Sequence, residues 1–121
     1  MTSAVQHRVR TQDGIALAAD CYGHDDARPV VLLLHGGGQN RHAWSTSARR
    51  LHACGYTVVA YDTRGHGDSD WDPAGRYDIE RLATDLLAVR EALQGQQQAR
   101  LLAPQREGHA GLAGADLCRR A

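Results

Sequence analysis

Two short stretches hold most of the residues that could do chemistry. The first reads HGGGQNRHAW at residues 35–44, and the second reads YDTRGHGDSDW at residues 61–71. Three consecutive glycines at 36–38 leave backbone N–H groups unshielded, and such groups can receive an anion or a developing oxyanion. The second stretch carries side chains suited to ion pairing and to acid–base or nucleophilic chemistry: Asp62, Arg64, His66 and Ser69.

Phosphate and metal binding fit these stretches poorly. A dinucleotide fingerprint fails because Arg41 stands three positions after Gly38, and a Walker motif fails because the chain has no lysine. A metal site built from His35, His42, Asp62 and His66 has no recognised ligand spacing. We therefore expect no cofactor and no metal. For the glycine run considered alone, a tight turn that binds no ligand remains an alternative interpretation.

A β-hairpin and two buried strands are expected to position these stretches. Residues 5–10 and 15–22 alternate apolar and polar side chains around the turn signal Asp13-Gly14. Residues 30–34 and 56–62 are nearly continuous apolar runs, as in strands covered on both faces. Each run leads into one of the two stretches.

Helices are expected between and after these strands. Apolar residues recur at helical spacing over 41–53, with Gly55 at the C-terminal position, and again over 79–93, with Asp78 as N-cap. Residues 99–103 form the next strand. The order predicts right-handed βαβ crossovers and a parallel sheet, in which chemistry sits at the carboxyl ends of the strands.

Length and charge narrow the class of protein. The chain has 121 residues, 14 Lys+Arg and 14 Asp+Glu, which suits one domain at most and gives no electrostatic footprint for nucleic acid. The longest apolar run, 30–34, is too short to span a bilayer, and the N-terminus has no basic segment followed by an apolar core. We expect a cytoplasmic protein with a small-molecule substrate and neither a nucleic acid nor a membrane as partner.

Together the two stretches resemble the α/β-hydrolase family at its loops after the third and fourth strands. The resemblance runs from about Thr11 to about Leu93 and implies the N-terminal part of that fold: a β-hairpin followed by a parallel βαβαβ unit, truncated after the fifth strand. It implies hydrolysis of ester or similar acyl bonds by a nucleophile at the turn after the fifth strand, with a later acid and a later His.

The resemblance also implies roles for individual residues. Gly37 would donate an oxyanion-hole N–H, with Gly38 as the fallback, and Trp44 is a weaker candidate for lining the substrate mouth. For the other residues that match the family motifs, the resemblance implies structural roles in the loops, including a backbone hydrogen bond for Ser69. These residues are His35, Gly36, Asp62, Arg64, Gly65, His66, Gly67 and Ser69.

The chain departs from the family after residues 99–103. The family would show small-x-nucleophile-x-Gly, whereas residues 104–108 read PQREG and G-x-S-x-G occurs nowhere. Residues 95–121 also contain no Val, Ile or Thr. We therefore divide the chain into residues 1–94, the N-terminal part of a hydrolase domain, and residues 95–121, a divergent tail. Either the tail is translated out of frame, or the chain is a short form whose tail makes a helix over 108–119.

Three functions follow as expectations. The chain can be the N-terminal fragment of an acyl hydrolase that is inactive alone, because the nucleophile, the triad acid and the catalytic His are missing. It can instead be a small binding module that holds a ligand at the glycine loop without turning it over. It can also be one half of a split hydrolase completed by a C-terminal half on another polypeptide.

Overall fold

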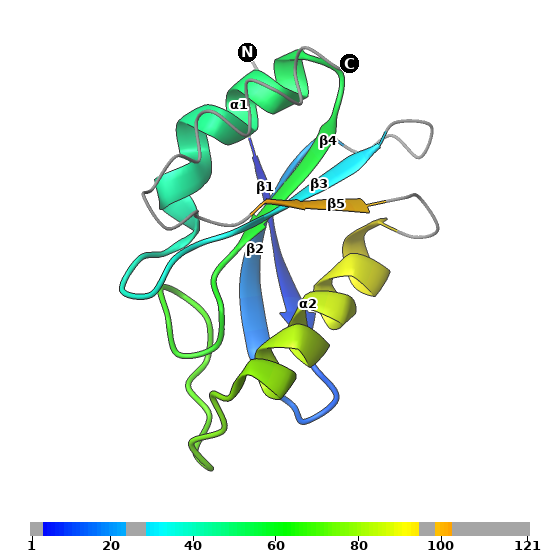
Figure 1. The fold of residues 1–121 in the computed structure, drawn as a ribbon. Coiled ribbons are helices and arrows are strands. Elements are labelled where there is room, and N and C mark those ends of the chain that lie inside the picture. Colours follow the sequence, from blue (N-terminus) through cyan, green and yellow to red (C-terminus); the bar gives the residue numbers. More distant parts are fainter. Residues whose placement is uncertain (1–3, 24–28, 95–98, 103–121) are drawn as a thin grey trace.

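The computed structural model describes residues 4–23, 29–94 and 99–102, which form a five-stranded sheet with helices on both faces (Figure 1). The strand order is β1-β2-β4-β3-β5. The predicted α/β class and the predicted hairpin followed by parallel strands are confirmed. The expected helix over 108–119 and the proposed tail, residues 95–121, lie largely outside the described residues.

The hairpin consists of β1 (Val5–Arg10) and β2 (Ala16–Tyr22), which pair antiparallel. Gly14 makes the connecting turn with a φ of +88°, a backbone conformation that favours glycine. All seven residues of β2 are buried, because β2 lies between β1 and β4 in the sheet. The alternation predicted over residues 15–22 places every second side chain in one core cluster: Ile15, Leu17, Ala19 and Cys21.

Three parallel strands form the rest of the sheet: β3 (Val30–Leu34), β4 (Thr57–Tyr61) and β5 (Ala99–Leu102). In the register of β3 and β4, Leu34 lies opposite Tyr61. The two chemical stretches, which begin at His35 and at Tyr61, therefore leave the sheet side by side. Their predicted position at the carboxyl ends of parallel strands is confirmed, and the register adds that the two strands are neighbours.

Two helical segments cover opposite faces of the sheet (Figure 1). The predicted helix over 41–53 divides into a 3-10 helix, η1 (Arg41–Trp44), and an α-helix, α1 (Ser45–Ala53). Asn40 caps η1, since its side chain accepts a hydrogen bond from the His42 N–H. On this face Trp44, Ala48 and Leu51 pack against residues of β3 and β4.

Helix α2 (Ile79–Gln94) covers the other face and begins where the sequence predicted. Asp78 caps it by accepting a hydrogen bond of 2.8 Å from the Arg81 N–H. The predicted apolar stripe is buried unevenly, because Val89 is 0% exposed and Ile79 is 79% exposed. No helix in the described part of the chain is long and apolar enough to cross a membrane.

Candidate functional site

The glycine loop after β3 is a tight turn. The Gly36 carbonyl accepts a hydrogen bond of 3.1 Å from the Gln39 N–H, and the Gly36 N–H donates to the Gln39 side-chain oxygen at 3.0 Å. Gly38, the third residue of this turn, has a φ of +77°, as a type II turn requires. The turn therefore needs glycine at Gly38.

Gly37 differs from Gly38 because neither its conformation nor its contacts require glycine. Its φ is not positive, and a Cβ built there would meet nothing within 4 Å. Gly37 is exposed, and among the described residues no acceptor is bonded to its N–H. An unshielded, unpaired N–H is the property expected of an oxyanion-hole donor.

Both ring nitrogens of His35 are hydrogen-bonded to backbone groups of the two loops, so His35 is not free to act as a base. Its Nε2 accepts a hydrogen bond of 3.0 Å from the Thr63 N–H, so the ring proton lies on Nδ1, which donates to the Gly36 carbonyl at 2.8 Å. Burial lowers the pKa of His35 below its ordinary value of 6.5, which keeps the ring neutral. The structural role expected for His35 agrees with these bonds.

Asp62 holds the loop after β4 to the start of η1. Its carboxylate accepts the Arg41 N–H and the Asp68 N–H, and it forms an ion pair with the Arg41 guanidinium. Gly67 lies against this carboxylate with a φ of +51°. The predicted roles of Asp62 and Gly67 in shaping this loop fit their positions.

Arg64 is the central ion-pairing residue of the site region. Its side chain is 0% exposed and forms a two-point contact with Asp85, with both distances 2.7 Å. Asp13 and Asp72 also pair with it, each at 3.0 Å. The hydrogen bonds that Arg64 donates to Asp85 raise the pKa of Arg64, and the hydrogen bonds that Asp13 accepts from Arg64 lower the pKa of Asp13.

Sequence reasoning predicted that Arg64 would tie down the loop, but it missed all three carboxylate partners. One signal was present: Asp85 stands within the apolar stripe of α2, where an acidic residue indicates a buried ion pair. Arg41, which is 3% exposed, was missed as well. Gly65 has a φ of +77°, as its predicted loop role requires.

Ser69 and His66 do not form a nucleophile–base pair. The buried Ser69 hydroxyl donates to the Asp62 carbonyl at 2.6 Å and accepts from the Ala18 N–H at 2.9 Å. The His66 ring contacts the Thr63 hydroxyl and the Arg64 carbonyl instead. The backbone hydrogen bond expected of Ser69 is confirmed.

The glycine loop opens onto an apolar pocket of about 320 Å³ between the two chemical loops and α2. Trp44 does not line it, because this residue is 2% exposed and lies in the core beneath α1. The substrate contact considered for Trp44 is therefore not found. The lining residues are Leu34, His35, Gly36, Gly37, Thr63, His66, Ile79, Leu82, Ala83 and Leu86.

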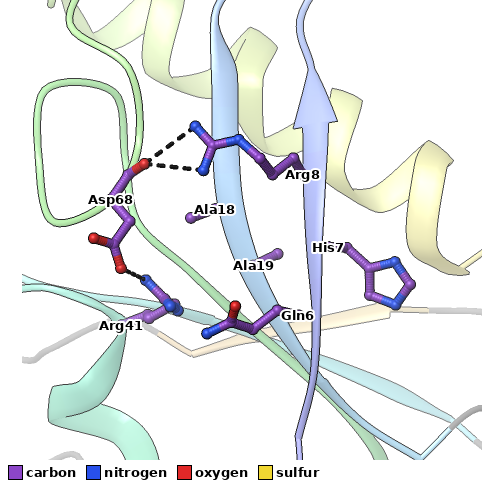
Figure 2. Close-up of a pocket in the computed structure, with 7 residues that line it drawn as sticks. All are labelled: Gln6, His7, Arg8, Ala18, Ala19, Arg41 and Asp68. Carbon is purple, nitrogen blue, oxygen red and sulfur yellow. Dashed lines mark hydrogen bonds and ion pairs between the residues drawn. The ribbon is translucent and has the colours of Figure 1, made fainter.

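A second pocket, of about 440 Å³, lies over the hairpin and shares no lining residue with the first (Figure 2). Its charged groups are already paired: Arg8 donates to the Asp68 carbonyl, and Arg41 donates to the Asp68 carboxylate at 3.0 Å. Within residues 4–23, 29–94 and 99–102, no group of three or more His, Cys, Asp or Glu side chains could hold a metal ion. The pocket at the glycine loop is the candidate site because it is lined by Gly37, whose N–H is unpaired among the described residues.

Comparison with known proteins identifies the family of this chain. Residues 29–103 match the family model described as the alpha/beta hydrolase fold. The chain is 36% identical over 85 residues to a non-heme chloroperoxidase of Streptomyces lividans and 36% identical over 84 residues to 3-oxoadipate enol-lactonase 2 of Acinetobacter baylyi. These matches cover 70% and 69% of this chain, and the chain spans 30% of the length of each enzyme.

A solved structure gives the same result. Epoxide hydrolase A from Mycobacterium thermoresistibile superposes with a TM-score of 0.74 at 29% sequence identity, over 84% of this chain and 31% of that one. The family match covers more than half of the 121 residues and includes the glycine loop, the loop after β4 and α2. The chain belongs to the α/β-hydrolase fold family.

Proposed function

We propose that this chain is the N-terminal part of a hydrolase of ester or similar acyl bonds, and that it supplies an oxyanion donor but no nucleophile. The observation that carries the proposal is the Gly37 N–H, which is exposed, unpaired among the described residues and located at the rim of an apolar pocket. A carbonyl oxygen placed against this N–H would be stabilised as negative charge develops on it.

The remaining catalytic groups are not supplied by the described residues. Ser45 and Ser47 lie on α1, and Ser69 is buried with both hydrogen-bonding functions engaged. Residues 103–121 contain no serine, and residues 104–108 have no acidic or thiol nucleophile at the third position. The proposal therefore assigns the nucleophile, the triad acid and the catalytic His to a complementing C-terminal part, on the same or a second polypeptide.

Some of the relatives support acyl chemistry, whereas others are named as a chloroperoxidase or an epoxide hydrolase, so together they fix no substrate. One of them is named as an enol-lactonase, which acts on an ester bond within a ring, and another solved relative is an esterase from Exiguobacterium antarcticum. A small binding module without turnover remains the alternative function, because an apolar pocket with one unpaired N–H can also hold a carbonyl ligand.

A chimera tests the proposal. Residues 1–102 of this chain are fused to the downstream part of the Acinetobacter baylyi enol-lactonase, and ester or lactone hydrolysis is measured. Gly37→Pro deletes the N–H at the second position of the turn, where proline is favoured, and Gly37→Ala keeps it. We expect Gly37→Pro to lower kcat by about 10²–10³-fold and Gly37→Ala to have little effect.

Equal activity of the two folded variants would contradict the assignment of Gly37. Thermal melts of both chimeras provide the control for folding. Tight carbonyl-ligand binding by the chain itself, combined with a chimera that folds but never hydrolyses an ester, would favour the binding module.

A further inference from the structure

Three side chains meet beneath the glycine loop, where neither the ion pairs nor the turn requires them. The Thr63 hydroxyl lies 3.2 Å from His35 Nε2 and 3.0 Å from His66 Nδ1, and the two imidazole ring centroids are 5.0 Å apart. Thr63 and His35 are buried, and all three residues line the apolar pocket. The proton positions in this cluster follow from its neighbours.

His66 sets the direction of the chain of hydrogen bonds. Its Nδ1 lies 3.2 Å from the Arg64 carbonyl oxygen, which can only accept, so Nδ1 must carry a proton. The same Nδ1–H is shared with the Thr63 hydroxyl oxygen, which acts as an acceptor. The hydroxyl proton of Thr63 then shares the single lone pair of His35 Nε2 with the Thr63 N–H, which is the shorter of the two contacts.

The position of the His35 proton in turn determines the orientation of the Gly37 N–H. With Nε2 accepting, the proton of His35 lies on Nδ1 and is donated to the Gly36 carbonyl. The peptide between Gly36 and Gly37 is trans, so its N–H points opposite to its carbonyl. The Gly37 N–H is thereby directed away from the His35 ring.

We propose that Thr63 and His66 are positioning residues of the glycine loop: the chain from His66 Nδ1 through the Thr63 hydroxyl to His35 fixes the Gly36–Gly37 peptide and aims the Gly37 N–H. The proposal rests on the proposed function, in which this N–H receives the substrate oxygen. Gln39 holds the turn through Gly36, but its bonds lie within the loop itself and do not connect it to the loop after β4.

The first test is made on the unaltered 121-residue chain. At about pH 8, where imidazoles are neutral, long-range ¹⁵N–¹H correlation spectra report which ring nitrogen carries the proton. We expect both His35 and His66 to carry it on Nδ1, and His42, which is exposed, provides an internal comparison. Finding His66 protonated on Nε2 would reverse the chain and overturn the proposal.

A matched pair of variants tests the hydroxyl. Thr63→Val keeps the shape and the backbone N–H but removes the hydroxyl, whereas Thr63→Ser keeps both polar groups. In both variants the Thr63 N–H still holds the His35 proton on Nδ1, so the expected change is in mobility. We expect the Gly37 order parameter to fall from about 0.85 to below about 0.6 in Thr63→Val and to be restored in Thr63→Ser. A folded Thr63→Val with an unchanged Gly37 order parameter would overturn the proposal.

His66→Phe provides an independent arm, because it preserves a ring against His35 and removes Nδ1. It decides the matter if Thr63→Val fails to fold: a mobile Gly37 supports the proposal, and a Gly37 as rigid as in the parent chain overturns it. Failure of this proposal would leave the activity difference between Gly37→Pro and Gly37→Ala in the chimera intact. Failure of the proposed function would instead remove that difference and leave the spectra unaltered.

Discussion

Gly67 lies so close to the Asp62 carboxylate that a Cβ at position 67 would overlap both carboxylate oxygens. Asp62 is 0% exposed and already accepts hydrogen bonds from Arg41 and Asp68, so it has no room to move away. The second glycine of the R-G-H-G sequence is therefore required by contact as well as by its φ of +51°.

The first prediction separates these two requirements. A positive φ alone costs alanine about 1 kcal/mol. Gly67→Ala should lower the free energy of unfolding by well over this amount, because steric overlap is added to backbone strain. Gly75→Ala is the matched control, since Gly75 has a φ of +69° and open space around it. Urea unfolding of both variants measures the difference, and equal losses would contradict the packing argument.

The second prediction concerns Arg64. Arg64→Ala should destabilise the fold by about 3–5 kcal/mol, because it leaves Asp13, Asp72 and Asp85 close together without their shared cation. Lysine should not restore stability, since it cannot make the two-point contact with Asp85. Arg49→Ala, on the exposed surface of α1, should change stability by less than about 0.5 kcal/mol. A free energy of unfolding for Arg64→Ala close to that of the parent chain would refute this role.

The third prediction is a pH dependence caused by His35. Burial lowers its folded-state pKa below 6.5, so the unfolded chain takes up this proton first as the pH falls. Stability should therefore decline as the pH drops from about 6.5 through the folded-state pKa, and the decline should be shallower in His35→Asn. Urea midpoints between pH 7.5 and 5 measure the slope. A folded-state titration midpoint of His35 at or above 6.5 would contradict the prediction.

The fourth prediction concerns Ser69. Its hydroxyl connects two segments of the chain, because it donates a hydrogen bond to the Asp62 carbonyl and accepts one from the Ala18 N–H. Both hydrogen bonds are buried. Ser69→Ala should cost about 1–3 kcal/mol of stability, because the Ala18 N–H loses its acceptor in a buried site. Ser47→Ala on α1 is the control, and it should be neutral or slightly stabilising because alanine favours helix. Equal stability of the two variants would show that Ser69 is not a structural residue.

Sequence patterns predicted the elements well where periodicity was strong. The apolar runs of β3 and β4 and the N-cap of α2 were readable because burial on both strand faces and capping leave local signatures. The 3-10 start at Arg41–Trp44 was missed, since nothing local separates it from an α-helical first turn.

The candidate site was predicted less completely. The glycine loop and the predicted roles of Asp62, Gly65, Gly67 and Ser69 followed from the two motifs. The partners of Arg64 did not, because Asp13, Asp72 and Asp85 come from three separate segments that only the tertiary fold brings together. The contact of Thr63 with His35 was equally invisible, since it depends on the register between β3 and β4, and the contact of Thr63 with His66 depends on the path of the loop after β4.

The most direct test of the central claim is active-site labelling of the purified 121-residue chain with a fluorophosphonate probe, followed by mass spectrometry. We expect no stoichiometric label on any of the four serines, because in the proposed function this chain supplies an oxyanion donor but no activated nucleophile. Stoichiometric labelling of Ser69 that is abolished by Ser69→Ala and by His66→Ala would contradict the account, and it would make the loop after β4 the catalytic site.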